Sequence, residues 1–403
     1  MTSTADAVAV SSEIDPFSDE FLANPFPFQE ELRELGPVVY LERYDVHAVA
    51  RYEDVHRALT DWQSLQSGAG VGLSNFLQEE PWRPPSLLLE ADPPRHDAPR
   101  ALLEKLLSQR RLRELGEHWK TDADALVDQV LSRGTEFDAV TDLAEVFPLR
   151  VFPDAVGIGK AGREHLLPYG DYAFNAFGPR NERVTGPAQT IAPTLEWIGA
   201  QCRRDNLAPG GFGAQIWDSA DQGDIAPEQA PLIVRSLLTA GVDTTVTGIA
   251  AVMHAVATHP EEYQRLRRDR SLLPRAFEEA VRLESPVQTF FRTTTSEISI
   301  AGVRIGPARK VLMFLGAANR DPRRWQHPDR YDLTRDPSGH VGFGMGLHQC
   351  VGQHVARLEA VSILSAVLDR VDSIGLTETP TRHLNNTLRG WESMPVRVGI
   401  QGG

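Results

Sequence analysis

Residues 343–352 read FGMGLHQCVG, and this stretch decides how the rest of the chain is interpreted. It places one thiol, Cys350, among three glycines, in a chain whose only other cysteine is Cys202. A helical pattern begins at about Val351, so the thiol is expected at a helix N-terminus, where free N–H groups and the helix dipole lower its pKa. Glycines without a Cβ let such a loop pass close to something bulky. The stretch predicts a thiolate ligand beneath a planar cofactor, and the alternative is a buried, inert cysteine beside a turn.

Composition excludes several classes of protein. The chain has 403 residues, of which 41% are hydrophobic and 24% charged, which is enough for a large core in one or two domains. Its net charge of −14 opposes binding to phosphate backbones, so no nucleic-acid partner is expected. Two cysteines are too few for a disulfide framework, a cysteine-ligated iron–sulfur cluster or a cysteine-rich zinc site. This cysteine usage fits a reducing cytosol.

Neither a signal peptide nor a membrane anchor is expected. Residues 1–16 lack a basic n-region and are interpreted as a flexible tail. The apolar segment 231–259 is interrupted by Arg235 and Asp243, and only about 14 apolar or small residues follow Asp243, fewer than a membrane span needs. A long helix buried in a soluble core is the better interpretation, and the predicted location is cytoplasmic.

The pattern along the chain predicts a mainly α protein with small β-sheets (α+β). Residues 38–61 fit two strands followed by a helix that begins near Tyr52, and residues 99–133 fit two helices. Further strands are expected in EISIAGVRI, KVLMFLG and the C-terminal PVRVGI. The Gly-, Ser- and Pro-rich segments 67–86 and 205–227 are predicted loops. Helical patterns resume directly after each loop, so a single domain over residues 1–403 is expected.

Five short motifs occur in an order that resembles the cytochrome P450 monooxygenases along essentially the whole chain. The motifs are the loop with Phe343, Gly344, Gly346, His348, Cys350 and Gly352; AGVDTT at 240–245; EEAVR with Glu279 and Arg282; HPDRYD at 327–332; and PPRHDAPR with His96 and Arg100. Each motif is weak alone, but together they are specific. The resemblance implies the P450 fold, a single domain shaped like a triangular prism.

The resemblance also implies a haem b cofactor with Cys350 as the axial thiolate ligand of its iron. The haem propionates need cationic or hydrogen-bonding partners. The candidates are His96, Arg100, Arg292 and His348. Glu279 and Arg282, one helical turn apart, are expected to form a buried structural cluster with Arg330 behind the thiolate loop.

The long helix is expected to activate oxygen. With about 100° per residue, one face carries Ser236, Thr239, Ala240, Asp243 and Thr247, with Thr244 at its edge. Reductive cleavage of an O–O bond consumes two protons, so an acid–alcohol pair suits the step. Asp243 is therefore predicted to relay protons, and Thr244 to hydrogen-bond dioxygen and a water.

Longer runs, such as EEPWRPPSLLLEADPPRH and PVQTFFRTTT, resemble the bacterial subfamily that oxidises para-substituted benzoates such as 4-methoxybenzoate. This resemblance implies that Arg83, Ser86 and Ser236 hold the substrate carboxylate. The implied walls of the ring pocket are Leu89, Phe174, Phe177, Val287 and Phe290, with Thr239 where serine is expected and Ala240 leaving room for the ring. Ser236 lies eight residues before Thr244, about 12 Å along a straight helix. A carboxylate held there points the para substituent toward the oxygen site, and Arg235 is expected at the access channel.

Electrons must come from another protein, because no nucleotide-binding G-x-G-x-x-G fingerprint is present. The resemblance implies a [2Fe–2S] ferredoxin and its NAD(P)H-dependent reductase. Their docking site could be a basic patch on the thiolate side, although a solvated helix face explains the same charges nearly as well. The patch would consist of Lys105, Arg110, Arg111, Arg113 and Arg357.

Other functions remain open from the sequence. A monooxygenase for a different small aromatic acid has the same motifs. A haem-thiolate sensor would not need Asp243 and Thr244. A peroxide-driven hydroxylase favours a carboxylate or an arginine at position 244. A thiol hydrolase would need Cys350 and His348 as nucleophile and base, but residues two apart at a glycine turn are poorly placed for that.

Overall fold

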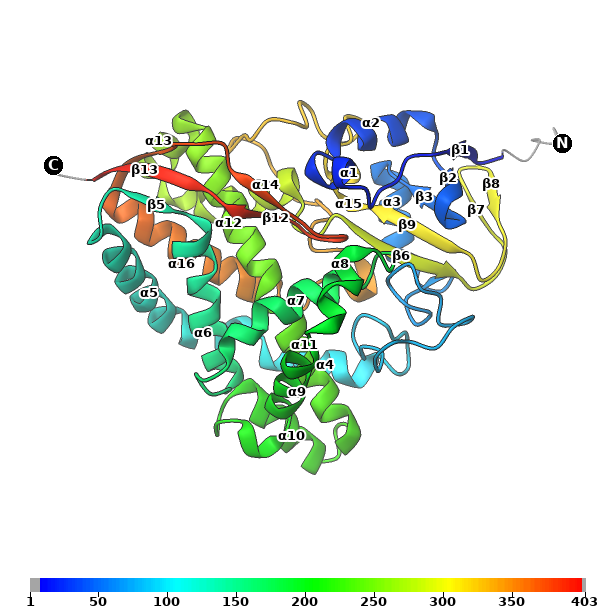
Figure 1. Cartoon of the computed structure of the whole chain (residues 1–403), viewed down its shortest axis with the longest axis horizontal. Coiled ribbons are helices and arrows are strands. Elements are labelled where there is room, and N and C mark those ends of the chain that lie inside the picture. The colour runs from blue at the N-terminus through cyan, green and yellow to red at the C-terminus, as the bar shows by residue number, and fades with distance from the viewer. Residues whose placement is uncertain (1–7, 401–403) are drawn as a thin grey trace.

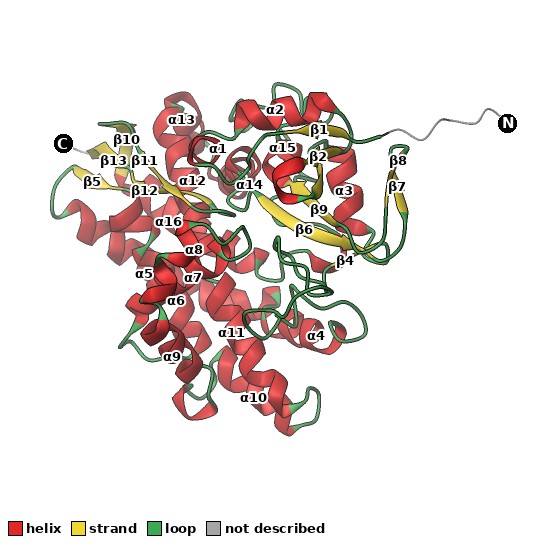
Figure 2. Ribbon diagram, turned by 45° about the vertical axis from the view of Figure 1, so that its right-hand side comes forward, coloured by secondary structure: helices red, strands yellow, loops and turns green. Residues whose placement is uncertain are grey.

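The computed structural model describes residues 8–400. Helices make up most of the molecule, which has a roughly triangular outline, and the strands gather at its two upper corners (Figure 1). Colouring by secondary structure shows the same division, with a helical body below and short sheets above (Figure 2). The prediction of a mainly α protein with small sheets is confirmed.

The helices follow the apolar periodicity of the sequence. The first half of the chain contains α1 (Asp19–Ala23), α2 (Phe26–Leu35), α3 (Tyr52–Thr60), α4 (Asp97–Leu106), α5 (Gln109–Leu131), α6 (Val146–Val156), α7 (Leu166–Asn175), α8 (Glu182–Thr185) and α9 (Ala192–Gln201). The second half contains α10 (Phe212–Asp221), α11 (Ala230–Ala240), α12 (Asp243–Thr258), α13 (Pro260–Arg268), α14 (Leu273–Glu284), α15 (Leu315–Asn319) and α16 (Gln353–Arg370).

The strands form four small sheets. They are β1 (Val10–Ser12), β2 (Val39–Leu41), β3 (Val46–Val49), β4 (Leu65–Gln66), β5 (Glu136–Asp138), β6 (Thr289–Thr294), β7 (Ile298–Ile300), β8 (Val303–Ile305), β9 (Lys310–Phe314), β10 (Val371–Leu376), β11 (Thr381–Leu384), β12 (Arg389–Ser393) and β13 (Pro395–Ile400). The six-stranded sheet has the order β1-β2-β3-β9-β6-β4, a three-stranded sheet has the order β10-β13-β5, and β11-β12 and β7-β8 are pairs. Strands β6 and β9 are antiparallel, with Arg292 opposite Val311.

Two predictions about irregular segments need correction. The segment 1–16 is not wholly a tail, because Val10–Ser12 pairs in parallel with Val39–Leu41; residues 1–7 lie outside the described residues. The segment 205–227 is not wholly a loop, because it contains α10. Phe212, Ile216 and Ala220 recur four residues apart and are buried, and this spacing was obscured by the neighbouring Gly and Asp residues.

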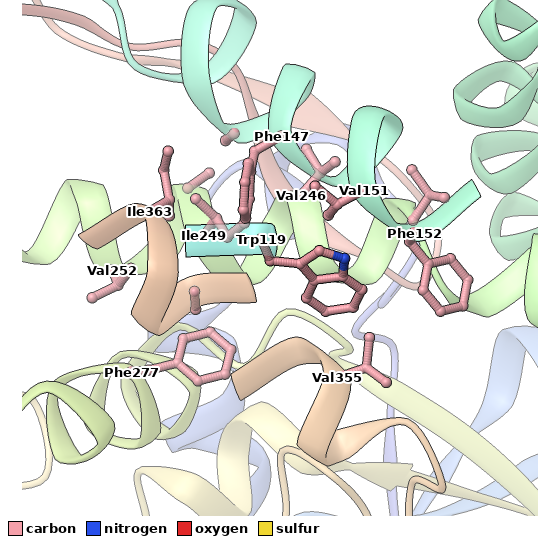
Figure 3. Close-up of a cluster of buried hydrophobic side chains, with 14 of the residues drawn as sticks. Trp119, Phe147, Val151, Phe152, Val246, Ile249, Val252, Phe277, Val355 and Ile363 are labelled. Atoms are coloured by element: carbon pink, nitrogen blue, oxygen red, sulfur yellow. The ribbon is translucent and has the colours of Figure 1, made fainter. Parts of the chain in front are cut away.

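The main hydrophobic core lies where α5, α6, α12, α14 and α16 meet. Trp119, Phe147, Ile249, Phe277 and Ile363 point into it from these five helices (Figure 3). Helix α12 runs through the middle, and nearly all of its length is buried. The core therefore holds α12 rigidly against the elements on both of its sides.

The long apolar helix has a break that the sequence pattern did not reveal. Helix α11 ends at Ala240 and α12 begins at Asp243. At the break, the hydroxyls of Thr244 and Thr245 donate to the carbonyls of Ala240 and Gly241, at 2.7 and 3.3 Å. A Cβ at position 241 would lie 2.1 Å from the Phe152 ring, so the close approach needs glycine there.

By length and composition, one helical stretch among residues 8–400 could cross a membrane, namely Pro227–Thr258. However, 72% of its most apolar window is buried inside the protein, as expected for a core helix.

Candidate active site

Cys350 lies in a loop between a short 3₁₀ turn, Gly346–His348, and helix α16. The predicted helix start at about Val351 is two residues too early, since α16 begins at Gln353. The Cys350 N–H donates to the Phe343 carbonyl at 2.8 Å, which closes the loop on itself. Gly344 and Gly346 have φ of +66° and +67°, a left-handed conformation that favours glycine.

The environment of the thiol corrects one expectation. Backbone N–H groups of Gly352 and Gln353 hydrogen-bond to the Cys350 sulfur and lower its pKa, as a helix N-terminus should. Burial raises the pKa more strongly, so the net direction is upward and not downward as predicted. A metal cation bound at the sulfur would favour the thiolate over the thiol.

A large cavity lies above this loop, between it and helix α11. The predicted site residues that line it are Arg83, Ser86, Leu89, Arg100, Phe174, Ser236, Thr239, Ala240, Thr244, Val287, Phe290, Arg292, His348 and Cys350. They come from the 67–96 loop, α4, α7, α11, α12, the segment 285–288 before β6, β6 itself and the thiolate loop. His96, Phe177 and Asp243 do not line it. No aspartate or glutamate is among the lining residues of the described chain.

Two buried residues near the thiolate loop, His96 and Arg292, fit the propionate groups of a haem, because neither has an anionic partner in the described chain. Both ring nitrogens of His96 are buried and have no hydrogen-bond partner among residues 8–400. Arg292 is 4% exposed, and its guanidinium donates only to the Phe291 carbonyl, without an acid partner in the described chain. Burial lowers the pKa of Arg292 to about 10. Unpaired buried donors of this kind are costly unless an anion completes them.

The other two propionate candidates already have protein partners. Arg100 donates to the Gln349 carbonyl at 2.6 Å and to Glu104 at 2.7 Å. The ring nitrogens of His348 lie 2.9 Å from the Leu88 carbonyl and 3.2 Å from Asp92. Both side chains line the cavity, so their proposed role requires either a shared contact or a change of partner.

Polar groups gather at the end of the cavity near α11. Arg83 donates to Glu90 at 2.8 Å, and the Ser86 N–H donates to the same carboxylate oxygen at 2.8 Å. The Ser86 and Ser236 hydroxyls lie 3.3 Å apart. Arg83, which was expected to hold the substrate carboxylate, is therefore already paired with an acid of the chain, Glu90. Glu90 follows Arg83 by only seven positions, but an irregular loop gives no periodicity from which the contact could be predicted.

Arg235 lines the cavity at the same end, whereas the sequence placed it at the access channel. Its guanidinium donates to the Pro84 carbonyl at 2.7 Å and has no acid partner within salt-bridge distance among residues 8–400. Burial lowers the pKa of Arg235. Helical geometry alone could not predict that Arg235 lines the cavity, because its side chain points toward a loop whose path the sequence does not specify.

Aromatic rings close one side of the cavity. Phe174 and Phe290 line it, and Phe177 packs behind them with ring centroids 5.7 and 5.9 Å away. Phe177 also lies beneath the Arg83 guanidinium at 5.9 Å. Phe177 was predicted to line the pocket, but it lies behind the residues that do. Trp391 is not a lining residue and stacks on His254 instead.

The acid and the alcohol of the predicted pair lie on different faces of α12. Thr244 lines the cavity, whereas Asp243 packs against Gly170 of α7. Thr247 also turns away and packs against Gly390 of β12. The single-face prediction assumed a continuous helix, and the break at Gly241–Val242 invalidates both that face and the 12 Å estimate for the separation of Ser236 and Thr244.

The buried cluster behind the thiolate loop contains a different arginine from the one predicted. Arg282 donates to both Glu279 oxygens, at 2.7 and 2.8 Å. The third member is Arg335, which donates to Glu279 at 2.9 Å. Arg330 is exposed and contributes only its backbone carbonyl to Arg282. The backbone turns between the two arginines, and the sequence motif alone does not show which side chain turns inward.

Comparison with known proteins agrees with this geometry. Residues 220–385 match the family described as Cytochrome P450. Cytochrome P450 CYP199A2 of Rhodopseudomonas palustris is 56% identical over 385 residues, covering 96% of this chain and 93% of that protein. The chain belongs to the cytochrome P450 family. This P450 is also 30% identical over 403 aligned residues to the beta-dihydromenaquinone-9 omega-hydroxylase of Mycobacterium tuberculosis, covering 96% of this chain and 78% of that one.

Solved structures share the fold. CYP109Q5 from Chondromyces apiculatus aligns with a TM-score of 0.80 at 28% identity, covering 97% of this P450 and 99% of that chain. Cytochrome P450 CREJ, in complex with (4-ethylphenyl) dihydrogen phosphate, aligns with a TM-score of 0.85 at 26% identity, covering 96% and 99%. This P450 is therefore a haem-thiolate monooxygenase with the P450 fold, as predicted from the sequence.

Proposed function

We propose that this P450 oxidises a small aromatic acid that it holds by the carboxylate, and that the reaction is O-demethylation of 4-methoxybenzoate to 4-hydroxybenzoate and formaldehyde. The observation that carries the proposal is the charge at the α11 end of the cavity. Two arginines, Arg83 and Arg235, stand there against one acid, Glu90, which leaves one uncompensated positive charge. A monoanionic substrate supplies the missing negative charge in a largely apolar cavity.

Hydrogen-bond donors at this end suit a carboxylate. The Ser86 and Ser236 hydroxyls, 3.3 Å apart, can both turn toward one carboxylate group, and the Arg235 guanidinium adds a charged donor. CREJ supports the same reasoning by analogy, since its ligand is also a para-substituted aromatic anion. With the acid held there and the ring between Phe174 and Phe290, the para substituent points toward Thr244.

The haem, when bound through Cys350, supplies the redox-active iron at which dioxygen is reduced. The chain's own residues do the rest: Arg235 and the two serines orient the acid, and the phenylalanines exclude water from the ring. Thr244 presents a hydroxyl to the cavity from the helix break. Transfer of one oxygen atom to the methoxy carbon gives a hydroxymethyl ether, which collapses to a phenol and formaldehyde.

The proposal is tested by comparing 4-methoxybenzoate with its methyl ester and with 4-methoxytoluene, by spin-state shift and by turnover. Losing one charged hydrogen-bonding partner costs about 1.5–3 kcal/mol, or roughly ten- to a hundredfold in affinity. Arg235→Gln should lower the affinity for 4-methoxybenzoate by a similar factor and leave the affinity for its methyl ester unchanged. Arg203→Gln, on the exposed segment after α9, is the matched control. Equal binding and turnover of the neutral analogues would refute the carboxylate anchor.

Electron supply by a [2Fe–2S] ferredoxin and an NAD(P)H-dependent reductase, in a cytoplasmic setting, is part of the proposal. Lys105, Arg110 and Arg113 are exposed on α4 and α5, and Arg111 is half-buried beside Glu114. Arg357 is held by Glu278, so it is a poorer docking residue than the others. An exposed positive patch on an acidic protein favours an acidic electron donor.

A peroxide-driven hydroxylase is a weaker candidate. That chemistry favours an acid or an arginine beside the oxygen site, and here Thr244 occupies that place in a cavity whose described lining contains no acid.

A further inference from the structure

Asp243 lies on the side of α12 that faces away from the cavity. A Cβ on Gly170 would lie only 2.7 Å from its Oδ2, so the carboxyl group rests directly on the backbone of α7. It accepts no hydrogen bond from any residue in the described part of the chain. Burial, followed by the charge of Asp171, raises the pKa of Asp243 to about 7. A carboxyl group in this state can take up and release protons near neutral pH.

The residue after Gly170, Asp171, belongs to a hydrogen-bonded group at the surface whose charges act on the Asp243 carboxyl group. Asp171 Oδ1 lies 2.7 Å from His383 Nε2 and also accepts from the side chains of Asn385, at 2.8 Å, and Asn175, at 3.1 Å. The His383 side chain is 47% exposed, so its ring meets solvent. The hydrogen bond to Asp171 raises the pKa of His383, which favours the imidazolium form.

Further acids surround the histidine from the elements packed against it. Glu392, from β12, raises the pKa of His383, and Glu145, before α6, raises that of Asp243. With Asp171 on α7 and Asp243 on α12, four acids face one histidine on β11. Such an excess of negative charge draws protons from solvent onto the ring and keeps them there until an acceptor is available.

We propose that His383 and Asp171 form the solvent end of the proton route that reaches the cavity through Asp243 and Thr244. Asp243 and Thr244 are the first two residues of α12, and the turn of about 100° between consecutive helical residues gives them different faces of that helix. Asp243 faces the surface cluster and Thr244 faces the cavity.

The number of protons delivered matches the number that a monooxygenase reaction consumes. One turnover consumes the substrate, dioxygen, two electrons from the external reductant and two protons, and yields the oxygenated product and water. Both protons end on the oxygen atom that leaves as water. Each is taken from solvent by His383 and passed to Asp171 and then to Asp243, so the histidine is restored by solvent and nothing in the chain is consumed.

The first test measures coupling. His383→Gln keeps an amide donor for Asp171 but cannot carry a proton, so a merely structural role would survive the change. We expect product per NADH to fall at least twofold, with a matching rise in hydrogen peroxide and unchanged substrate affinity. His118→Gln, an exposed histidine on α5, should behave like the parent. The double variant His383→Gln/Asp243→Asn should form as much product per NADH as Asp243→Asn alone, because both changes interrupt the same route. Unchanged coupling in His383→Gln overturns the proposal.

The second test does not depend on turnover. Ring-labelled histidines are titrated by NMR in the diamagnetic ferrous carbon monoxide complex, and the His383 signal is assigned by its loss in His383→Gln. Asp243→Asn should lower the His383 pKa, and Asp171→Asn should lower it further, because Asp171 is the larger cause. In the parent, coupling should fall as the pH rises above the measured His383 pKa. A His383 pKa that does not respond to Asp243→Asn contradicts the link between the two groups.

Discussion

At the scale of single residues, the thiol is the group on which the cofactor depends. Cys350→Ala should abolish the thiolate-type absorption of the reduced carbon monoxide complex, because the other cysteine cannot replace it. Cys202 is buried in the core, and burial raises its pKa to about 12. Cys202→Ala is therefore the matched control and should keep the absorption. A Cys350→Ala protein that retained the parent's spectrum would disprove the assignment.

Thr244 should control how electrons are used and leave binding unaffected. Its hydroxyl lies at the helix break and lines the cavity, and it donates to the Ala240 carbonyl and not to any partner of Arg83 or Arg235. Thr244→Ala is expected to bind substrate normally and to release hydrogen peroxide at the expense of product. The ratio of product to NADH consumed measures this. Thr258→Ala, at the far end of α12, should leave the ratio as it is.

Where a short motif fixes the backbone, the sequence placed single residues at the cavity, and their roles stay predictions. Cys350 and Thr244 both lie in such motifs, and both line the cavity. It failed where a side chain's direction depends on a distant element. The turn of Asp243 toward α7 and the pairing of Arg83 with Glu90 depend on loop paths that no local periodicity encodes.

At the scale of elements, helices with clear apolar spacing were predicted to within a few residues. Helices α4 and α5, predicted within residues 99–133, and the two strands before α3 are examples. The break between α11 and α12 could not be predicted, because hydroxyl groups there replace backbone donors and the apolar pattern continues across it. Helix α10 was missed because Gly and Asp around it resemble a loop.

The cluster that joins α14 to the loop before the thiolate gives a prediction about stability. Arg335→Ala removes a charged hydrogen bond to the fully buried Glu279 and should lower the free energy of unfolding by about 1.5–3 kcal/mol. Arg330→Ala, five residues earlier and exposed, should change it by less than about 0.5 kcal/mol. Chemical denaturation of both variants separates the two arginines. A larger loss of stability in Arg330→Ala than in Arg335→Ala would show that Arg330 is the third member of the cluster, as the sequence motif suggested.

At the scale of the whole molecule, one carboxylate ties the helical body to the C-terminal strands. Glu284, at the end of α14, lies 3.1 Å from Arg382 of β11 and 3.3 Å from Arg389 of β12. Although burial opposes it, the surrounding arginines lower the pKa of Glu284 to about 2 from an ordinary 4.5. The ionised form is therefore favoured more in the folded protein than in the unfolded chain.

The pH dependence of stability follows from this shift. Because the folded pKa is depressed, the contribution is complete above about pH 4.5 and is lost as the pH falls toward 2. A shift of this size is worth about 3 kcal/mol. Glu284→Gln should lower the free energy of unfolding most at pH 7, and the difference from the parent should shrink below pH 4. Glu297→Gln, an exposed pair partner, is the control and should show little effect at any pH.

The pairing of Arg83 with Glu90 has a consequence for redesigning this cavity. Replacing Arg83 alone would take the direct ion-pair partner from the buried Glu90 carboxylate, and Arg235 does not lie within salt-bridge distance to replace it, so the loss is strongly destabilising. Replacing Arg235 alone would leave Arg83 and Glu90 balanced, in an end of the cavity with no net charge. A variant meant to accept uncharged aromatic ethers should therefore begin at Arg235, and should change Arg83 and Glu90 only together.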